Sequence, residues 1–287
     1  MLITVLLVFE LWRQSALPRH KFGFSFFLTR VWDPIAEQFG ALPFIYGTLV
    51  TAAVALLLAV PLGIGAAIFL AELAPLRLSD PLQFLIDLLA AVPSVIYGFL
   101  GFFIVVPLMR EWIEPALKKS LGFLPLFQGP AYGIGFLTAG IVLAIMVIPY
   151  IISVSREVLL SVPRDQREAA LALGSTRWES TWKVVVPFAR TGIMGSIFLA
   201  LARALGETMA VTMVIGNTPT ISASLFSSGY SIAAVIANEF TEATGDLYLQ
   251  SLIELGLVLF LLTFILNGLA RLMMLLTTRR GTGMGNA

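Results

Sequence analysis

The chain has 287 residues, of which 58% are hydrophobic and only 12% are charged, and its formal net charge is +1. Soluble proteins carry about 25% charged residues, so this composition predicts an all-α integral membrane protein rather than a soluble one. The small net charge gives no reason to expect nucleic acid as a partner. Cysteine is absent and His20 is the single histidine, which excludes disulfides, cysteine nucleophiles and histidine clusters. We therefore predict no catalytic residues and no metal site.

Residues 1–43 are predicted to form a partial transmembrane helix followed by a periplasmic segment. Residues 1–12 are apolar, but a helix needs about 20 residues to cross the hydrocarbon core of a membrane. No basic residue precedes this apolar run, which disfavours a signal peptide. We expect a first transmembrane helix that lacks its beginning. The aromatic residues between Phe22 and Trp32 favour the membrane interface.

Five longer apolar segments each have the length of a transmembrane helix, which with the first gives about six helices. They are residues 44–73, 82–109, 133–154, 188–215 and 249–276. The second holds Asp87, which is predicted to be a buried, hydrogen-bonded acid that helps helices to pack. Residues 110–132 are predicted to form an amphipathic loop. The Ser/Thr-rich segment 220–248 has helical periodicity at 232–240.

The longest polar interruption is residues 161–187, which are predicted to form two short helices joined by a tight turn. Pro163 suits the first position of a helix, and Gly174 suits the left-handed residue that ends one. Thr176 followed by Glu179 predicts a capping box at the start of the second helix.

Two interpretations of this polar elbow remain open from its composition. The small residues of Glu168-Ala169-Ala170 permit close approach of another surface, and Trp178 and Trp182 lie one turn apart on one helix face. The elbow is therefore either a docking site for a cytosolic partner or an ordinary solvated loop.

The distribution of Lys and Arg predicts the orientation in the membrane, because basic residues concentrate on the cytosolic side. The elbow and the C-terminal end are rich in basic residues, whereas the segment 220–248 has none. We expect the elbow, the C-terminus and a short tail at 281–287 to be cytosolic.

The fourth span holds Arg203 and Glu207, which are four residues apart and on a continuous helix would share a face and could pair. A lone arginine at this depth costs at least ~2.5 kcal/mol, so both charges should face a protein interior or an aqueous pathway. One interpretation is a structural ion pair between helices. The other is a station for phosphate-like oxyanions, with Thr208 and Thr212 as hydroxyl partners.

The spacing within the elbow resembles the cytosolic signature of type I ABC-importer permeases, which runs from Glu-Ala-Ala through a glycine to an apolar-x-apolar-proline ending. The matching residues are Glu168, Ala169, Ala170, Gly174, Val184, Val186 and Pro187. Valine stands where isoleucine and leucine are commoner. Four further segments resemble the phosphate-specific, PstC-type branch: LPFIYGTLVT at 42–51, FLAELAP at 69–75, AVPSVIYGF at 91–99 and RALGETMAVTMVIGN at 203–217.

The resemblance implies a permease domain at 44–280, with a coupling loop at 156–187, in the bacterial cytoplasmic (inner) membrane. Such a subunit pairs with a PstA-like permease, two cytosolic ATPase subunits that bind ATP and Mg, and a periplasmic phosphate-binding protein. It is surrounded by membrane lipid, holds no cofactor itself and catalyses no bond chemistry. The coupling residues would be Glu168, Ala169, Ala170, Gly174 and Trp178. Arg203 and Glu207 match the family's charged pair associated with phosphate passage.

Three other functions compete with that of a phosphate permease. A permease for another oxyanion, such as sulfate or molybdate, would carry the same elbow, and only residues 203–217 favour phosphate. A proton-coupled secondary transporter typically has internal repeats, and none is visible. An intramembrane enzyme needs a catalytic constellation that the residues do not supply.

Overall fold

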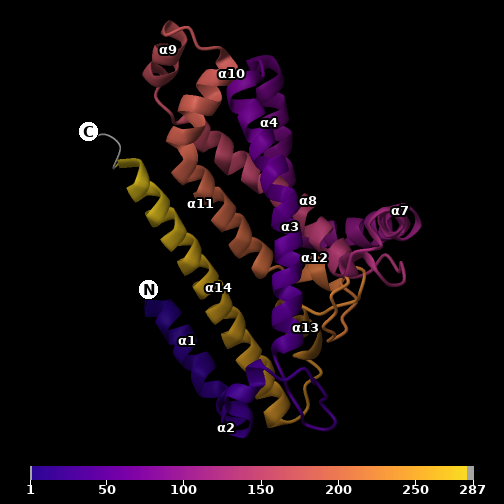
Figure 1. Cartoon of the computed structure of the whole chain (residues 1–287). Helices are drawn as coiled ribbons and strands as arrows, with labels where there is room; N and C mark the ends of the chain where they lie inside the picture. Colours follow the sequence, from indigo (N-terminus) through magenta and orange to yellow (C-terminus); the bar gives the residue numbers. More distant parts are fainter. Residues whose placement is uncertain (1, 283–287) are drawn as a thin grey trace. The chain divides into compact units, whose positions relative to one another are not determined.

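The computed structural model describes residues 2–282, and the side chains of residues 2–272. Within this range the chain is almost entirely helical, apart from connecting loops and an isolated antiparallel bridge between Asp33 and Gln38 (Figure 1). The predicted all-α fold is confirmed. The chain divides into two compact units. The first comprises the chain up to Val54, Pro93–Leu143 and Leu205–Phe264, and the second comprises Ala55–Val92, Ala144–Ala204 and the described chain from Ile265 onward.

Five of the described helical segments are long and apolar enough to cross a membrane. They are Leu42–Leu73, Ser94–Leu121, Phe136–Leu160, Arg177–Leu205 and Asp246–Leu272. Helix α1 (Leu2–Gln14) has 13 residues, which is fewer than the ~20 needed to span a membrane. These are the helices of a multi-pass membrane protein.

The elements named next either make up these spans or connect them. In the first unit they are α2 (Ala16–Phe22), η1 (Gly23–Phe27), α5 (Ser94–Leu100), η3 (Gly101–Val105), α6 (Val106–Leu108), η4 (Met109–Ile113), α7 (Glu114–Leu121), η5 (Pro125–Phe127), α12 (Met209–Thr212) and α13 (Ile232–Glu239). In the second unit they are η2 (Phe69–Leu73), α4 (Leu76–Ala90), α9 (Arg164–Ala172), α10 (Arg177–Ser180), η6 (Thr181–Val185) and α11 (Val186–Leu205). The long helices α3 (Leu42–Ile68), α8 (Phe136–Leu160) and α14 (Asp246–Thr282) have residues in both units, and the last residue of α11, Leu205, belongs to the first unit.

The predicted span 82–109 is wrong, because it joins parts of two helices. Helix α4 ends at Ala90, and a new helical segment starts at Ser94. Pro93 separates them, since a proline donates no N–H and disfavours a helical conformation in the residue before it. The new segment continues to Leu121, so much of the predicted loop 110–132 is helical. The sequence is apolar on both sides of the break at Pro93, so hydropathy alone does not reveal where one helix ends and the next begins.

The predicted span 188–215 is displaced as well. Elements α10, η6 and α11 form one continuous helical segment, Arg177–Leu205, so the second helix of the elbow is the start of the span itself. The π-helical η6 directly precedes the segment holding Pro187, which has no N–H to donate. The segment ends at Leu205, and the short helix α12 follows.

Other predictions agree with the structure. Helix α13 confirms the helical periodicity at 232–240. Asp87 accepts hydrogen bonds from Ser153 Oγ at 2.8 Å and from Gln83 Nε2 at 2.7 Å, which confirms a hydrogen-bonded acid between α4 and α8. Its side chain is exposed, however, rather than buried. The predicted tail 281–287 lies mostly outside the described residues, since α14 is described up to Thr282.

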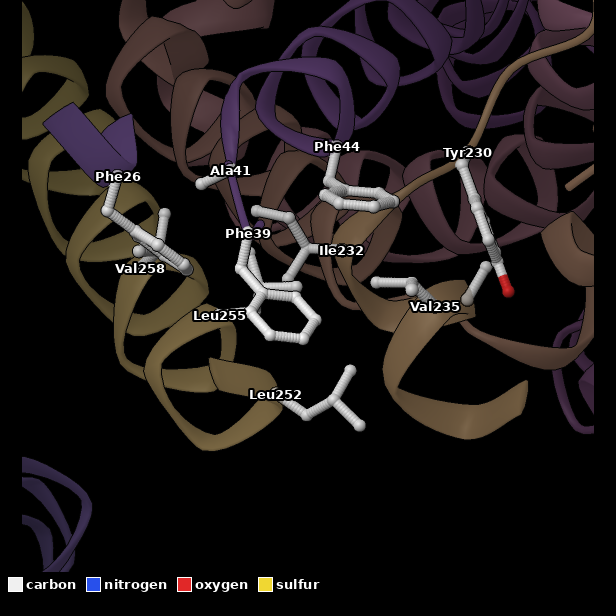
Figure 2. Packing of buried hydrophobic residues seen from close by; sticks show 11 residues of the cluster. Phe26, Phe39, Ala41, Phe44, Tyr230, Ile232, Val235, Leu252, Leu255 and Val258 are labelled. Carbon is white, nitrogen blue, oxygen red and sulfur yellow. The ribbon is translucent and has the colours of Figure 1, made fainter. Parts of the chain in front are cut away.

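The core of the first unit is rich in aromatic residues and includes the segment after α2 (Figure 2). Phe26, Phe39 and Phe44 pack with residues of α13 and α14. A single carboxylate joins these elements: Glu239 accepts from Trp32 Nε1 at 2.8 Å and from the Tyr248 hydroxyl at 2.7 Å. The segment predicted to be periplasmic is therefore an integral part of this unit.

The core of the second unit joins the end of α3 to α8 and α11. Its buried residues are Ala67, Ile68, Leu70, Ile152, Leu159, Val162, Val185, Ala189 and Ile193. Val162 before α9 and Val185 after α10 both belong to this core. Close-packed side chains therefore hold the two ends of the elbow in place.

Two glycines of α3 provide a matched test of packing. A methyl group added at Gly47 would collide with the Tyr230 carbonyl oxygen, whereas one added at Gly65 would meet nothing within 4 Å. We expect Gly47→Ala to lower the free energy of unfolding by about 1–3 kcal/mol. Gly65→Ala should leave it unchanged or raise it by up to about 1 kcal/mol. Thermal unfolding in detergent measures both, and equal midpoints for the two variants would contradict this packing.

Candidate coupling loop and substrate pathway

The turn of the elbow has the geometry that its sequence predicts. Gly174 follows α9 with a φ of +87°, the left-handed conformation that favours glycine. The Thr176 side chain accepts from the Glu179 backbone N–H, and the Glu179 carboxylate accepts from the Thr176 backbone N–H, which completes the predicted capping box. Pro163 is the cap residue of α9 rather than its first helical residue. The turn between α9 and α10 is therefore specified locally.

A buried ion pair fastens α9 to the rest of the second unit. Arg167 Nη2 donates to Glu72 Oε1 at 2.7 Å, and its Nε lies 3.2 Å from both Glu72 oxygens. Only 20% of the Arg167 side chain and 10% of the Glu72 side chain are exposed. Arg167 also donates to the carbonyl oxygens of Leu159 and Val162, at the end of α8 and just beyond it. One guanidinium group thus joins α9, the end of the first span and the end of α8.

Sequence analysis missed this pair, although both residues lie in segments that carry the resemblance. Glu72 belongs to FLAELAP, and Arg167 directly precedes Glu168-Ala169-Ala170. Four carbonyl or carboxylate oxygens around a single guanidinium are a strong, charge-assisted arrangement. The separation of 95 residues along the chain gave no local pattern that could reveal it.

The outer face of the elbow is exposed and apolar. Leu173 is 88% exposed and Trp178 is 56% exposed, and the Trp178 and Trp182 rings pack edge to face with centroids 5.6 Å apart. Glu168 and Ala169 are exposed, whereas Ala170 is buried against the unit. Exposed aromatic and aliphatic side chains gathered on a polar segment are characteristic of an interaction surface. The elbow therefore presents apolar side chains that the rest of the described chain does not cover.

A shallow cleft lies beside this surface. Its lining residues are Glu72, Arg167, Leu171, Arg177, Ser180 and Thr181. The Glu72–Arg167 pair is thus part of the lining. A partner that fills the cleft would contact the ion pair that fastens α9.

Arg203 lies in the last turn of α11, in the second unit. Its guanidinium carbon is 5.9 Å from the centre of the Tyr150 ring, at the outer limit of a cation–π interaction. The side chain is exposed. The fork of N–H donors is therefore accessible to an anion.

Glu207 lies beyond a helix break, in the first unit. The spacing of Arg203 and Glu207 predicted that they share one face of a continuous helix. This prediction is wrong, because α11 ends at Leu205 and α12 starts at Met209. Glu207 Oε1 instead accepts from the backbone N–H of Ala210 at 3.3 Å. The break gives the two charges separate local environments.

The two predicted hydroxyl partners lie at either end of α12. Thr212 Oγ1 donates to the Thr208 carbonyl oxygen at 2.8 Å, which is an ordinary helical side-chain bond. Thr208 Oγ1 lies 3.4 Å from the Gly206 carbonyl oxygen. Both side chains are half-buried. The structure therefore brings Glu207, Thr208 and Thr212 together around one short helix.

After α12 the chain is irregular but its backbone is hydrogen-bonded. Gly229 N donates to the Ile215 carbonyl oxygen at 2.9 Å, and Thr218 N donates to the Gly229 carbonyl oxygen at 3.0 Å. Gly216, with a φ of +97°, allows the reversal. Non-helical backbone is tolerated at membrane depth only inside protein or beside water. These hydrogen bonds therefore give partners within the protein to part of this irregular backbone.

Helix α12 packs closely on α5 within the first unit. A methyl group added at Gly98 would lie 2.6 Å from Met213 Sδ and 3.2 Å from Ala210 Cα. Gly98 belongs to the segment AVPSVIYGF, and Ala210 to the segment 203–217. Two of the segments that carry the resemblance are thus in direct contact. Among the described residues, no group of three His, Cys, Asp or Glu side chains could hold a metal ion.

Residues 59–275 match the family described as the inner membrane component of binding-protein-dependent transport systems. This range covers the elbow and the pathway candidates. The chain belongs to this family of transport permeases. It is accordingly a multi-pass membrane protein whose relatives are subunits of ABC transporters.

Curated relatives within the family share about half of their residues with this permease. The phosphate transport system permease protein PstC of Mesorhizobium japonicum is 51% identical over 258 residues, which is 88% of this chain and 79% of the relative. The protein of the same name in Xylella fastidiosa is 52% identical over 262 residues, covering 90% and 81%. A probable PstC of Methanocaldococcus jannaschii is 41% identical over 260 residues, covering 88% and 82%.

Solved structures support the fold of the permease. The methionine ABC transporter MetNI in an inward-facing conformation aligns with a TM-score of 0.59 at 15% identity, covering 85% of this chain and 98% of that chain. A bacterial ABC transporter involved in import of the acidic polysaccharide alginate also has a TM-score of 0.59 at 15% identity, covering 95% and 94%. At this identity the likeness concerns the fold alone.

The Glu72–Arg167 pair can be tested without transport. Glu72→Gln removes the charge that neutralises a largely buried guanidinium, and hydrogen bonds to charged groups contribute about 1.5–3 kcal/mol. We expect the elbow of the variant to open more often, so that trypsin cleaves within 164–177 about tenfold faster. Glu157→Gln, which alters an exposed carboxylate of α8, is the control and should cleave at the wild-type rate. Equal rates for all three proteins would show that the pair does not hold α9.

Proposed function

We propose that this chain is the transmembrane permease subunit of an ATP-driven importer of inorganic phosphate. The observation that carries the proposal is the identity of 51–52%, over 88–90% of the chain, with proteins named phosphate transport system permease protein PstC. The segment 203–217 and the exposed Arg203 fork provide a chemical reason for phosphate, because a planar set of N–H donors matches oxyanion geometry. The permease would supply half of the translocation pathway.

The proposed transporter contains other subunits. A second, PstA-like permease would form the other half of the pathway, and a periplasmic phosphate-binding protein would deliver the substrate. Two cytosolic ATPase subunits would bind ATP and Mg, since this chain has no Gly-Lys-Ser/Thr phosphate-binding loop. We propose that the chain is itself non-catalytic. Its elbow and C-terminus would face the cytosol of a bacterial cell, beneath the inner membrane.

In the proposed mechanism the elbow transmits ATPase movement to the spans. An ATPase subunit would grip the exposed face that carries Leu173 and Trp178, and would move α9. Because Arg167 binds Glu72 as well as the Leu159 and Val162 carbonyl oxygens, a force on α9 acts directly on the first and third spans. A buried pair with several partners is suited to this role because breaking it is costly.

The proposed phosphate pathway includes a station at Arg203 and, around α12, the side chains of Glu207, Thr208 and Thr212. Arg203 would donate to phosphate oxygens, since its charge is permanent and its N–H groups are accessible. Glu207 would repel the more highly charged phosphate dianion and could accept a hydrogen bond from a protonated phosphate oxygen. The Thr208 and Thr212 hydroxyl groups would donate to phosphate by turning away from the backbone carbonyl oxygens that they now contact.

Arg203→Gln tests the station. The substitution keeps a polar side chain but shortens it and removes its charge and guanidinium fork, so phosphate uptake should fall by at least a hundredfold, the loss of about 2.7 kcal/mol of anion stabilisation. Uptake of radiolabelled phosphate by cells or proteoliposomes is the measurement. Complex assembly, followed by co-purification of the ATPase subunits, should be unchanged.

Arg30→Gln is the matched control, because Arg30 is an exposed residue of a loop outside the station. It should transport phosphate at the wild-type rate. Transport at the wild-type rate by Arg203→Gln would instead show that Arg203 has a structural role and does not bind phosphate. Competition by excess sulfate as strong as that by excess phosphate would contradict phosphate as the substrate.

Gly174→Val tests the coupling turn. A methyl group added at Gly174 meets nothing within 4 Å, so the effect of valine is the cost of the left-handed conformation, about 1–2 kcal/mol, and not a clash. We expect phosphate-stimulated ATP hydrolysis by the assembled transporter to be lost. Gly174→Asn should retain most of it, because asparagine tolerates this conformation. Equal hydrolysis in both variants would remove the coupling role of the turn.

A further inference from the structure

A cavity in the first unit contains a buried carboxylate that neither the coupling loop nor the substrate station uses. The cavity has a volume of about 270 Å³, and its lining residues are Trp12, Arg19, Gly23, Phe24, Phe27, Glu254, Leu257, Val258 and Leu261. They belong to α1, α2, η1 and α14. The walls are almost wholly apolar, with one acidic and one basic side chain among them.

The acidic residue, Glu254, lacks a hydrogen-bonding partner. It is 2% exposed, and its Oε2 atom is buried without any donor. Such a carboxylate is costly unless a cation or donor approaches it. Neighbouring Gln250, one turn earlier, is already bonded, since its Oε1 accepts from the Leu17 backbone N–H at 2.9 Å. That bond joins α2 to α14 beside the cavity and leaves Glu254 as the open acceptor.

The basic residue, Arg19, is positioned but has donors to spare. Its guanidinium carbon lies 3.7 Å from the centre of the Trp12 ring, and Nε donates to the Ser15 carbonyl oxygen at 3.0 Å. Nη2 also donates to the Trp12 carbonyl oxygen. Two of five N–H groups are thereby used, and three remain. Arg19 and Glu254 line one cavity without forming an ion pair.

We propose that this cavity binds a phospholipid with an ethanolamine head group. The ammonium group would donate to the Glu254 carboxylate, and the phosphate would accept from the free N–H groups of Arg19. The head group therefore offers each side chain a group of opposite charge: ammonium for Glu254 and phosphate for Arg19. This lipid site is separate from the phosphate station, since it lies on other helices and requires a membrane ligand.

The surroundings favour a lipid over a soluble amine. Trp12, Phe24 and Leu261 are exposed at the cavity while contributing to its apolar wall, so acyl chains can continue along the same surface. Glu254 lies eight residues into α14, about 12 Å along the helix axis from Asp246, a depth compatible with a head-group region. Tryptophan and arginine are residues that concentrate at such an interface.

The head-group chemistry distinguishes ethanolamine from other lipids. A choline head group has no N–H to donate to Glu254, so the buried Oε2 atom would remain unsatisfied. A glycerol head group has hydroxyl donors but no cation, so it would leave the charge of the Glu254 carboxylate without a counterion. An ethanolamine head group alone among these three meets both side chains.

Native mass spectrometry of the full chain, after exchange into phosphatidylethanolamine, phosphatidylcholine or phosphatidylglycerol, tests the proposal. The wild-type chain should retain one phosphatidylethanolamine and bind it about tenfold more tightly than the other two. Glu254→Gln and Arg19→Gln should each lose about tenfold of that affinity. Glu10→Gln and Arg13→Gln change a half-buried and an exposed side chain of α1 that do not line the cavity, and these matched controls should bind as the wild type does.

Thermal unfolding shows whether a variant has simply failed to fold. In lipid-free detergent, Glu254→Gln should be at least as stable as the wild type, because it removes an unpaired buried carboxylate. Added phosphatidylethanolamine should raise the wild-type midpoint and leave that of the variant unchanged.

Equal retention of the three lipids by the wild type, or undiminished retention by Glu254→Gln, would overturn the proposal. A photo-reactive side chain at position 261 provides an independent check in native membranes. Cross-linking to phospholipid supports the site, whereas capture of a polypeptide would assign the cavity to a protein partner.

Discussion

Inside a membrane every backbone N–H and C=O group must find its partner within the protein, because water does not enter the hydrocarbon core. Most of this chain meets the requirement with long helices. The segment after Leu205 meets it differently: α11 ends, α12 makes a single turn, and the irregular chain beyond is bonded to itself and to the start of α8. Within this interruption Glu207 accepts from the backbone of α12, and Thr208 and Thr212 lie at the two ends of that short helix.

The elbow depends on a second constraint, the cost of burying a charge without a partner. Arg167 is largely buried and is satisfied by Glu72 and by two carbonyl oxygens near the end of α8. The same bonds that stabilise the charge also connect α9 to the spans. Coupling and stability therefore rest on the same group, which explains how a short polar helix can pass a force to apolar ones.

Sequence patterns predicted local features well and boundaries poorly. Gly174, the capping box of Thr176 and Glu179, and helix α13 follow from interactions within a few residues, and the structure contains them. The segment 82–109 is the opposite case. Its uniform apolar composition continues across Pro93, so hydropathy merged two helices into one span. The shared helix face predicted for Arg203 and Glu207 failed for a similar reason, because the four-residue spacing presumes a continuous helix, and α11 ends at Leu205.

The sequence by itself determined the class of protein, the turn of the elbow and the resemblance to a permease family, since composition and short-range spacing encode them. The tertiary structure alone decided which distant residues meet. Glu72 and Arg167 are 95 positions apart, and Arg19 and Glu254 line one cavity from nearly opposite ends of the chain. Such contacts arise from packing of whole helices, where burial makes unpaired charges costly, and no local pattern records them.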